Sequence, residues 1–260
     1  MSVETALQES PGHRTRDLLP GRSPWVAMYH SVDDCADDPY NVTVTPDRLR
    51  QQLHWLRSRG LHGVSVAQLL DARCRGAGRG LVALTFDDGY GDFLENALPL
   101  LRHYECTATV FVLPGRLGGE NGWDAEGPRK PLLTAQGIRA AAAAGMEIGS
   151  HGLTHVDLTL ADDEQRRAEI QRSKLQIEEL IGREVFGFCY PYGSVDAQTV
   201  EGVRRAGYRY GCAISPGPLT SVYAMPRVFV GQADTPWRLE LKRRVHRIRR
   251  RPWQVGEDAR

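Results

Sequence analysis

The sequence has 260 residues, and its 33 Lys and Arg residues almost balance its 32 Asp and Glu residues, so the formal net charge is +1. Hydrophobic residues make up 41% and charged residues 25%, which excludes an intrinsically disordered chain and a nucleic-acid binder that acts through bulk charge. No apolar run approaches the length of a transmembrane helix.

The N-terminal stretch and the cysteines bear on the compartment. Residues 1–23 are polar, lack the apolar core and cleavage site of a secretory signal, and predict a loose arm. The five cysteines, at positions 35, 74, 106, 189 and 212, are odd in number and include no C-x-x-C pair. They indicate reduced thiols, and we therefore expect a cytoplasmic protein.

Strand-like and helix-like segments alternate along most of the chain. The expected strands are short apolar runs at residues 25–30, 62–66, 81–86, 107–113, 146–150, 185–190, 210–214 and 226–231. The expected helices lie at residues 46–60, 133–145 and 162–181. This alternation predicts an α/β fold with a mainly parallel sheet. About seven βα units favour a distorted (β/α) barrel, formed by residues 24–235 as a single domain, over an open sheet.

The C-terminal segment, residues 236–260, is strongly basic. From Arg238 to Arg260 there are nine basic and three acidic residues, and Leu241, Val245 and Ile248 recur at helical spacing. One interpretation is a closing helix that lays this apolar stripe on the domain. The other is a basic helix, over residues 238–251, that contacts an anionic membrane surface.

Polar motifs follow three of the expected strands, where barrel enzymes gather their chemistry. The strand at 81–86 runs into Asp87, Asp88 and Gly89. Neighbouring side chains of an extended backbone point in different directions, so one carboxylate can bind a metal while the other stays free as a base. The same residues are also common in a turn that caps a helix.

The other two motifs carry imidazoles and a tight turn. In SHGLTH, His151 and His155 can converge on one cation and leave positions open for water and substrate, although this spacing alone is a weak indication. In FGFCYPYG, the turn at Pro191 and Tyr192 can present a backbone N–H to a developing oxyanion or serve a purely structural role.

The ordered series T-F-D-D-G, S-H-x-x-x-H and Y-P-Y-G resembles the polysaccharide deacetylase family, also called carbohydrate esterase family 4 or the NodB-homology group. The resemblance covers residues 24–231. It implies the NodB-homology fold and a metal-dependent hydrolysis of the N-acetyl group of an N-acetylated sugar, with release of acetate. The substrate would be a poly- or oligosaccharide, or a lipid- or nucleotide-linked glycan, and no nucleic acid is expected as a partner.

Matched position by position, the resemblance makes Asp88, His151 and His155 the ligands of one divalent metal ion. Zinc is the expected metal, with cobalt or nickel as alternatives. Asp87 would be the general base, and the backbone N–H of Tyr192 would stabilise the tetrahedral oxyanion.

Two positions depart from the family pattern. Cys189 stands where many members have an Arg that orients the base, and Arg227 in MPRVFVG is a candidate to reach the site from another strand end. Many members also supply a catalytic His from a Leu-x-His motif near the C-terminal end. Here the only His after residue 212 is His246, within the basic segment. The first strand ends instead in VAMYHSV, similar to the poly-N-acetylglucosamine deacetylase subset, so His30 is expected to protonate the leaving amine.

Substrate contacts are assigned to Pro191, Tyr192 and Trp123, because apolar sugar faces pack on aromatic rings. Trp123 lies in a Gly- and Pro-rich loop at residues 117–131, of a kind that often faces substrate. Two alternative functions are a metal-dependent amidase that acts on another C–N bond of a small biosynthetic intermediate, and a catalytically weak carbohydrate-binding module. The intact carboxylate and imidazole motifs weigh against the binding module.

Overall fold

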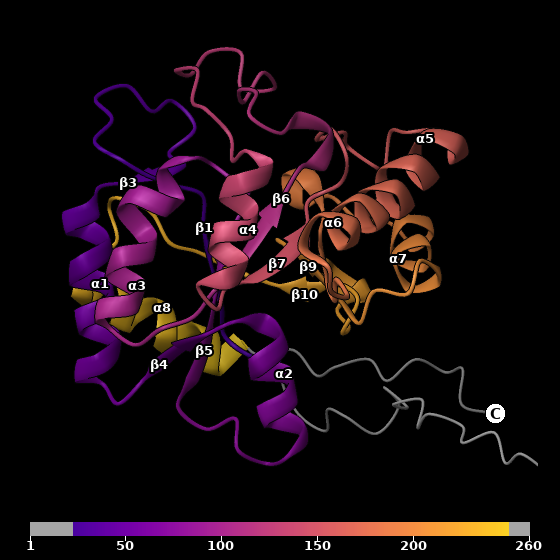
Figure 1. Ribbon diagram of the computed structural model, residues 1–260. Helices are drawn as coiled ribbons and strands as arrows, with labels where there is room; N and C mark the ends of the chain where they lie inside the picture. The colour runs from indigo at the N-terminus through magenta and orange to yellow at the C-terminus, as the bar shows by residue number, and fades with distance from the viewer. Residues whose placement is uncertain (1–22, 250–260) are drawn as a thin grey trace, which may run out of the picture.

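The computed structural model describes residues 23–249 of the protein (Figure 1). Its strands are β1 (Val26–Tyr29), β2 (Ser31–Val32), β3 (Thr43–Val44), β4 (His62–Val64), β5 (Leu81–Phe86), β6 (Thr109–Val112), β7 (Glu147–Ser150), β8 (Gly187–Cys189), β9 (Tyr210–Ala213), β10 (Met225–Pro226) and β11 (Val228–Phe229). Its helices are α1 (Pro46–Ser58), α2 (Val66–Cys74), α3 (Leu98–His103), α4 (Ala135–Ala143), α5 (Asp163–Arg167), α6 (Ser173–Ile181), α7 (Ala197–Arg205) and α8 (Pro236–Arg249).

The central sheet is parallel throughout and nearly closes into a barrel. Its strands follow the order β10-β9-β8-β7-β6-β5-β1-β11, and β4 pairs with the start of β5. One short segment joins the two edges of this order: Met225 pairs with Cys212 of β9, and three residues later Val228 pairs with Ala27 of β1. The predicted distorted (β/α) barrel is confirmed, and Arg227 lies at the point where this segment changes partners.

Alternate residues of the strands divide the core into two parts. Val26, Ala83 and Phe111 belong to an inner cluster with Leu69 and Leu70 of α2, so this helix packs across the start of the barrel. Side chains of the other parity contact the surrounding helices. Figure 1 shows α2 at one end of the molecule and the long loops that follow β2 and β6 at the other. Polar residues at the carboxyl ends of the strands therefore share the end with the long loops.

The structure replaces the strand predicted at residues 226–231 by the two short strands β10 and β11, and it shortens the one predicted at residues 62–66. The run at 62–66 ends as a strand at Val64, because Ser65 caps α2. The Ser65 hydroxyl accepts the N–H of Gln68, while the Gln68 side chain accepts the N–H of Ser65. This reciprocal capping box begins the helix at Val66, which the sequence pattern had assigned to the strand.

The C-terminal helix forms, but with a different face toward the domain. Leu239 is buried, whereas Leu241 and Ile248 are 52% and 80% exposed, so the prediction that these two lie on the domain is wrong. Lys242 instead donates to the Phe229 carbonyl, and the His246 ring stacks on Trp25 at 6.4 Å. Long basic side chains can cover the domain with their aliphatic stems, which frees the apolar residues to face outward.

Two predicted segments lie wholly or partly outside the described residues. The N-terminal arm at residues 1–23 is described only at residue 23, and the C-terminal segment only to residue 249. Within the described part of the chain, no helix combines the length and the hydrophobicity that a membrane span requires.

Candidate active site

Three buried side chains converge at the carboxyl ends of β5 and β7. The Nε2 atoms of His151 and His155 lie 3.1 and 3.3 Å from the same oxygen, Oδ1 of Asp88. The Nδ1 atom of His151 lies 2.9 Å from the carbonyl oxygen of Cys189, which fixes Nδ1 as the protonated nitrogen and leaves the Nε2 lone pair facing Asp88. The sequence-predicted metal ligands are therefore brought together.

The chemistry of this trio fits a cation. Asp88 Oδ1 is buried and has no hydrogen-bond partner among the described residues. An unsatisfied buried oxygen that faces imidazole lone pairs is costly, whereas a divalent ion between the three atoms would satisfy all of them. Burial alone would raise the pKa of Asp88, but hydrogen bonds and positive charge from His151 and His155, when these imidazoles are protonated, hold it well below its usual range. The carboxylate form that a metal requires is thereby favoured.

The backbone is strained where these side chains are presented. Among residues 23–249, five residues other than glycine have positive φ, and Asp88 (68°), His155 (73°) and Tyr192 (58°) are three of them. Such conformations cost about 1–3 kcal/mol each and persist where the surroundings over-determine them. Their concentration at three strand ends indicates that this edge is built for function.

Asp87, next to the trio, is held by a different set of groups. The Arg227 guanidinium donates to Asp87 Oδ1 at 2.6 Å, and it also donates to the Thr85 hydroxyl and the Ala213 carbonyl. Burial would raise the pKa of Asp87, but Arg227, His30 and His151 outweigh burial and lower it. Asp87 is therefore ionised and aligned, and although it is not one of the three side chains around Asp88 Oδ1, it lies close to His151 and Cys189.

His30 and Cys189 face the second oxygen of the same carboxylate. His30 Nε2 lies 3.8 Å from Asp87 Oδ2, and the Cys189 Sγ lies 3.6 Å from it. Burial raises the pKa of the Cys189 thiol well above its usual range, so the sulfur stays neutral. Where many family members have an Arg, this chain thus has the neutral thiol of Cys189. The guanidinium that holds Asp87 comes instead from Arg227, which binds the other carboxylate oxygen.

The aromatic residues singled out in the sequence form a wall beside the trio. The Trp123 ring stacks on His155 with the centroids 4.2 Å apart, and the Tyr192 ring meets His155 edge-on at 4.7 Å. Pro191 is buried at the base of the same turn, while the Tyr192 side chain is 54% exposed. The loop at 117–131 therefore does reach the site through Trp123.

Sequence reasoning missed Glu169. This buried residue lies in a π-helical turn, Ala168–Arg172, and its Oε2 accepts the backbone N–H groups of Leu153 and Thr154 at 2.6 and 2.9 Å. Its other oxygen accepts the Thr154 hydroxyl. Glu169 thereby ties down the loop between His151 and His155. No local motif marks it, because its partners are 15 and 16 residues away in the chain.

The chain is similar in sequence to known polysaccharide deacetylases. The family model for polysaccharide deacetylase matches residues 75–211. A poly-beta-1,6-N-acetyl-D-glucosamine N-deacetylase from Staphylococcus aureus (strain MSSA476) is 22% identical over 203 residues, which cover 73% of this chain and 68% of that protein. The Escherichia coli (strain K12) protein of the same name is 39% identical over 103 residues, which cover 36% of this chain but only 15% of that relative.

A solved structure supports the fold. The Streptococcus pyogenes deacetylase PplD, determined in complex with acetate, superposes with a TM-score of 0.72 at 23% identity over 86% of this chain and 98% of its own. The family match itself excludes His30 and Arg227 but contains the TFDDG, SHGLTH and FGFCYPYG motifs. Since it extends over more than half of the 260 residues, the protein belongs to the polysaccharide deacetylase family.

Proposed function

We propose that the protein removes the N-acetyl group from an N-acetylated sugar by hydrolysis, with a divalent metal ion held by Asp88, His151 and His155. The observation that carries the proposal is the approach of two imidazole Nε2 atoms to one unsatisfied carboxylate oxygen, beside a second carboxylate held by Arg227. When bound, such an ion supplies a Lewis acid for the acetamide carbonyl and lowers the pKa of water.

The neighbouring residues would carry the proton transfers. Asp87 is ionised and would accept the proton of the attacking water, with Arg227 holding the carboxylate in place. His30, whose Nε2 lies 3.8 Å from Asp87 Oδ2, would donate a proton to the leaving amine. The turn at Tyr192 would offer its backbone N–H to the oxyanion. One carboxylate and one imidazole thus divide the base and acid roles.

The substrate proposed is a β-linked N-acetylglucosamine polymer or oligomer. Two relatives bear the name poly-beta-1,6-N-acetyl-D-glucosamine N-deacetylase. The rings of Trp123 and Tyr192 border the metal ligands, and aromatic faces suit the apolar faces of sugar rings. A sugar that packs against this wall would place its acetamide beside Asp87 and Asp88.

The first test is acetate release from β-1,4- and β-1,6-linked N-acetylglucosamine oligomers. Metal-stripped protein is expected to release no acetate, and stoichiometric zinc, cobalt or nickel to restore release, because the proposed reaction needs the ion to polarise the acetamide carbonyl and to lower the pKa of water. The faster linkage identifies the substrate class. Protein that binds one metal ion yet releases no acetate from either oligomer contradicts the proposal.

Glu169 is expected to act as a positioning residue for the two imidazoles. Glu169→Ala frees the N–H groups of Leu153 and Thr154 and should lower zinc affinity by about 10–100-fold, the usual effect of losing such outer support. Competition against a chromophoric chelator measures this affinity. Glu164→Ala, at an exposed position one turn earlier, is the matched control. Equal zinc affinity in the two variants would assign Glu169 a merely structural role.

We also propose that α8 contacts an anionic membrane surface. Trp237, Leu241 and Ile248 are exposed, and their spacing places them on one helical face among basic residues. Co-sedimentation with anionic vesicles should retain the protein, and Leu241→Ser with Ile248→Ser should release it. Protein that stays in the supernatant with anionic vesicles at low salt would remove this contact.

A further inference from the structure

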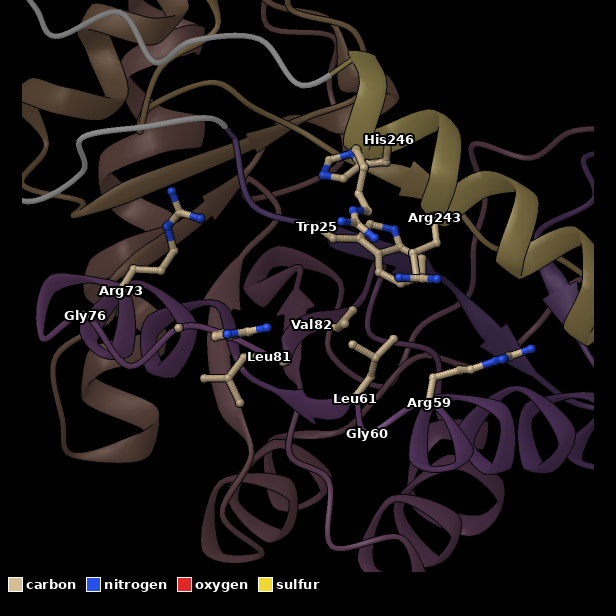
Figure 2. A pocket seen from close by; sticks show the side chains of 14 residues that line it. Trp25, Arg59, Gly60, Leu61, Arg73, Gly76, Leu81, Val82, Arg243 and His246 are labelled. Atoms are coloured by element: carbon tan, nitrogen blue, oxygen red, sulfur yellow. The ribbon is translucent and has the colours of Figure 1, made fainter.

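A basic cavity lies at the opposite end of the barrel from the candidate active site (Figure 2). Its volume is about 920 Å³, within the range of small-molecule sites. Leu81 and Val82, the first residues of β5, line it, whereas Asp87 and Asp88 follow the last residue of that strand. At about 3.3 Å per residue the two sites are roughly 20 Å apart, so one sugar cannot occupy both.

Arginines from three separate segments line the cavity. Arg59 ends α1, Arg73 and Arg79 belong to α2 and the loop that follows it, and Arg243 and Arg247 come from α8. Figure 2 shows Arg73 and Arg59 at the two sides and Arg243 below α8. The described lining residues include no carboxylate.

Within residues 23–249, Glu240 is the one carboxylate that ion-pairs with Arg59, Arg79, Arg243 or Arg247. Glu240 pairs with Arg243 at 2.6 Å and approaches Arg59 at 3.9 Å. Arg79 and Arg247 are exposed and form no ion pair within residues 23–249. Leaving Arg73 aside, the four other arginines carry four positive charges and Glu240 carries one negative charge, which leaves an excess of three positive charges. Such a concentration of one sign attracts and binds anions.

The surroundings suit a ligand that carries phosphate. Guanidinium groups match phosphate oxygens in a two-pronged geometry and are always charged. At Gly60 and Gly76 nothing lies within 4 Å of where a side chain would begin, so the rim stays open at these points. A terminal phosphate brings about 1.5–2 negative charges and a phosphodiester about one, so a ligand with two adjacent phosphates offsets most or all of an excess of three.

We propose that this cavity binds a ligand with two neighbouring phosphate groups, at a site separate from the deacetylase centre. The cavity has its own wall from α8, the helix that also exposes an apolar face. The two phosphates can come from a soluble diphosphate or from a lipid headgroup, and the experiment separates these sources.

Inorganic pyrophosphate is the probe, titrated calorimetrically into the full-length protein at about 0.15 M salt. It should bind one site, and Arg79→Ala with Arg247→Ala should weaken binding about tenfold or more. The control double variant is Arg102→Ala with Arg139→Ala, two exposed arginines on other helices with the same change of charge. Both double variants should release acetate as the parent does.

Co-sedimentation identifies the source of the phosphates. Phosphatidylcholine vesicles with cardiolipin, whose headgroup has two phosphates, are compared with vesicles of equal charge that carry a lipid with one phosphate, for the same three proteins. Cardiolipin-dependent retention that only the cavity variant loses assigns a lipid headgroup. Pyrophosphate binding that only the cavity variant loses, without cardiolipin-dependent retention, assigns a soluble ligand. No pyrophosphate binding, or equal binding by both double variants, overturns the proposal.

Discussion

Asp87→Asn is expected to lower kcat for acetate release by about a hundred- to ten-thousand-fold, the range that general bases contribute. The amide cannot take a proton from water, yet its oxygen can still accept the hydrogen bond from Arg227, so the geometry of the pocket should survive. Asp87 lies outside the Asp88 trio, and zinc stoichiometry should therefore stay at one. Initial rates on N-acetylglucosamine oligomers and metal analysis of the same samples provide the measurement.

A matched variant separates lost chemistry from lost structure. Asp71→Asn makes the same change at a half-buried carboxylate of α2, which pairs with Arg209 at the other end of the molecule. It should retain full activity. Asp87→Asn with activity within tenfold of the parent would show that another group takes the proton. Loss of zinc along with activity would instead make Asp87 a ligand.

Much of the site could be predicted because each motif directly follows a strand. In a parallel barrel all carboxyl ends of the strands meet at one edge, so Asp88 after β5 and His151 after β7 must approach each other. Short apolar runs in the sequence are enough to predict which strand each of these polar residues follows. One carboxylate and two imidazoles then indicated a metal site, and the family resemblance assigned a role to each residue.

The residues that support the site were harder to predict, because their contacts cross long stretches of chain. Arg227 reaches Asp87 across 140 residues, and only the change of partners in the segment Met225–Phe229 explains why it points inward. Glu169 lies within a predicted helix, but nothing in the helical pattern distinguishes it from a surface carboxylate. Hydrophobic periodicity predicts which side of a helix or strand is buried, but it does not predict which polar groups that side will contact.

In the C-terminal helix, hydrophobic periodicity also fails to predict which side chains contact the domain. One of the two interpretations placed its apolar positions on the domain, yet Leu241 and Ile248 face outward. Periodicity identifies an amphipathic helix correctly but cannot say what covers its apolar face. In α8 the inward contacts come from Leu239, Lys242 and His246, and the apolar face is left for another surface.

Arg227→Gln is expected to move the acid limb of the kcat/KM profile to higher pH. Burial favours the protonated form of Asp87, and Arg227 is the strongest influence that lowers its pKa. Without the guanidinium the pKa rises, so the carboxylate needed as base is lost at a higher pH as the solution is acidified. Raising the pH should then recover much of the rate, which a misfolded protein would not do.

The same variant should be less stable, and the loss should depend on pH in a defined direction. Removing one partner of a buried ion pair costs about 3–5 kcal/mol, because Asp87 is left charged and unpaired. In the parent, the lowered pKa of Asp87 contributes stability above the pKa of an unfolded aspartate, about 3.9, and this contribution fades as pH falls below it. The gap in unfolding free energy between parent and variant should therefore be widest near neutral pH and narrow toward acid.

Arg227→Lys supplies the comparison that isolates the geometry. It keeps a positive charge near Asp87 but cannot also reach the Thr85 hydroxyl and the Ala213 carbonyl as the guanidinium does. We expect its acid limb to lie between those of the parent and Arg227→Gln, with a lower kcat from a less well aligned base. If Arg227→Gln kept the parent's pH profile, the low pKa of Asp87 would have to come from His30 and His151, and the guanidinium would serve packing alone.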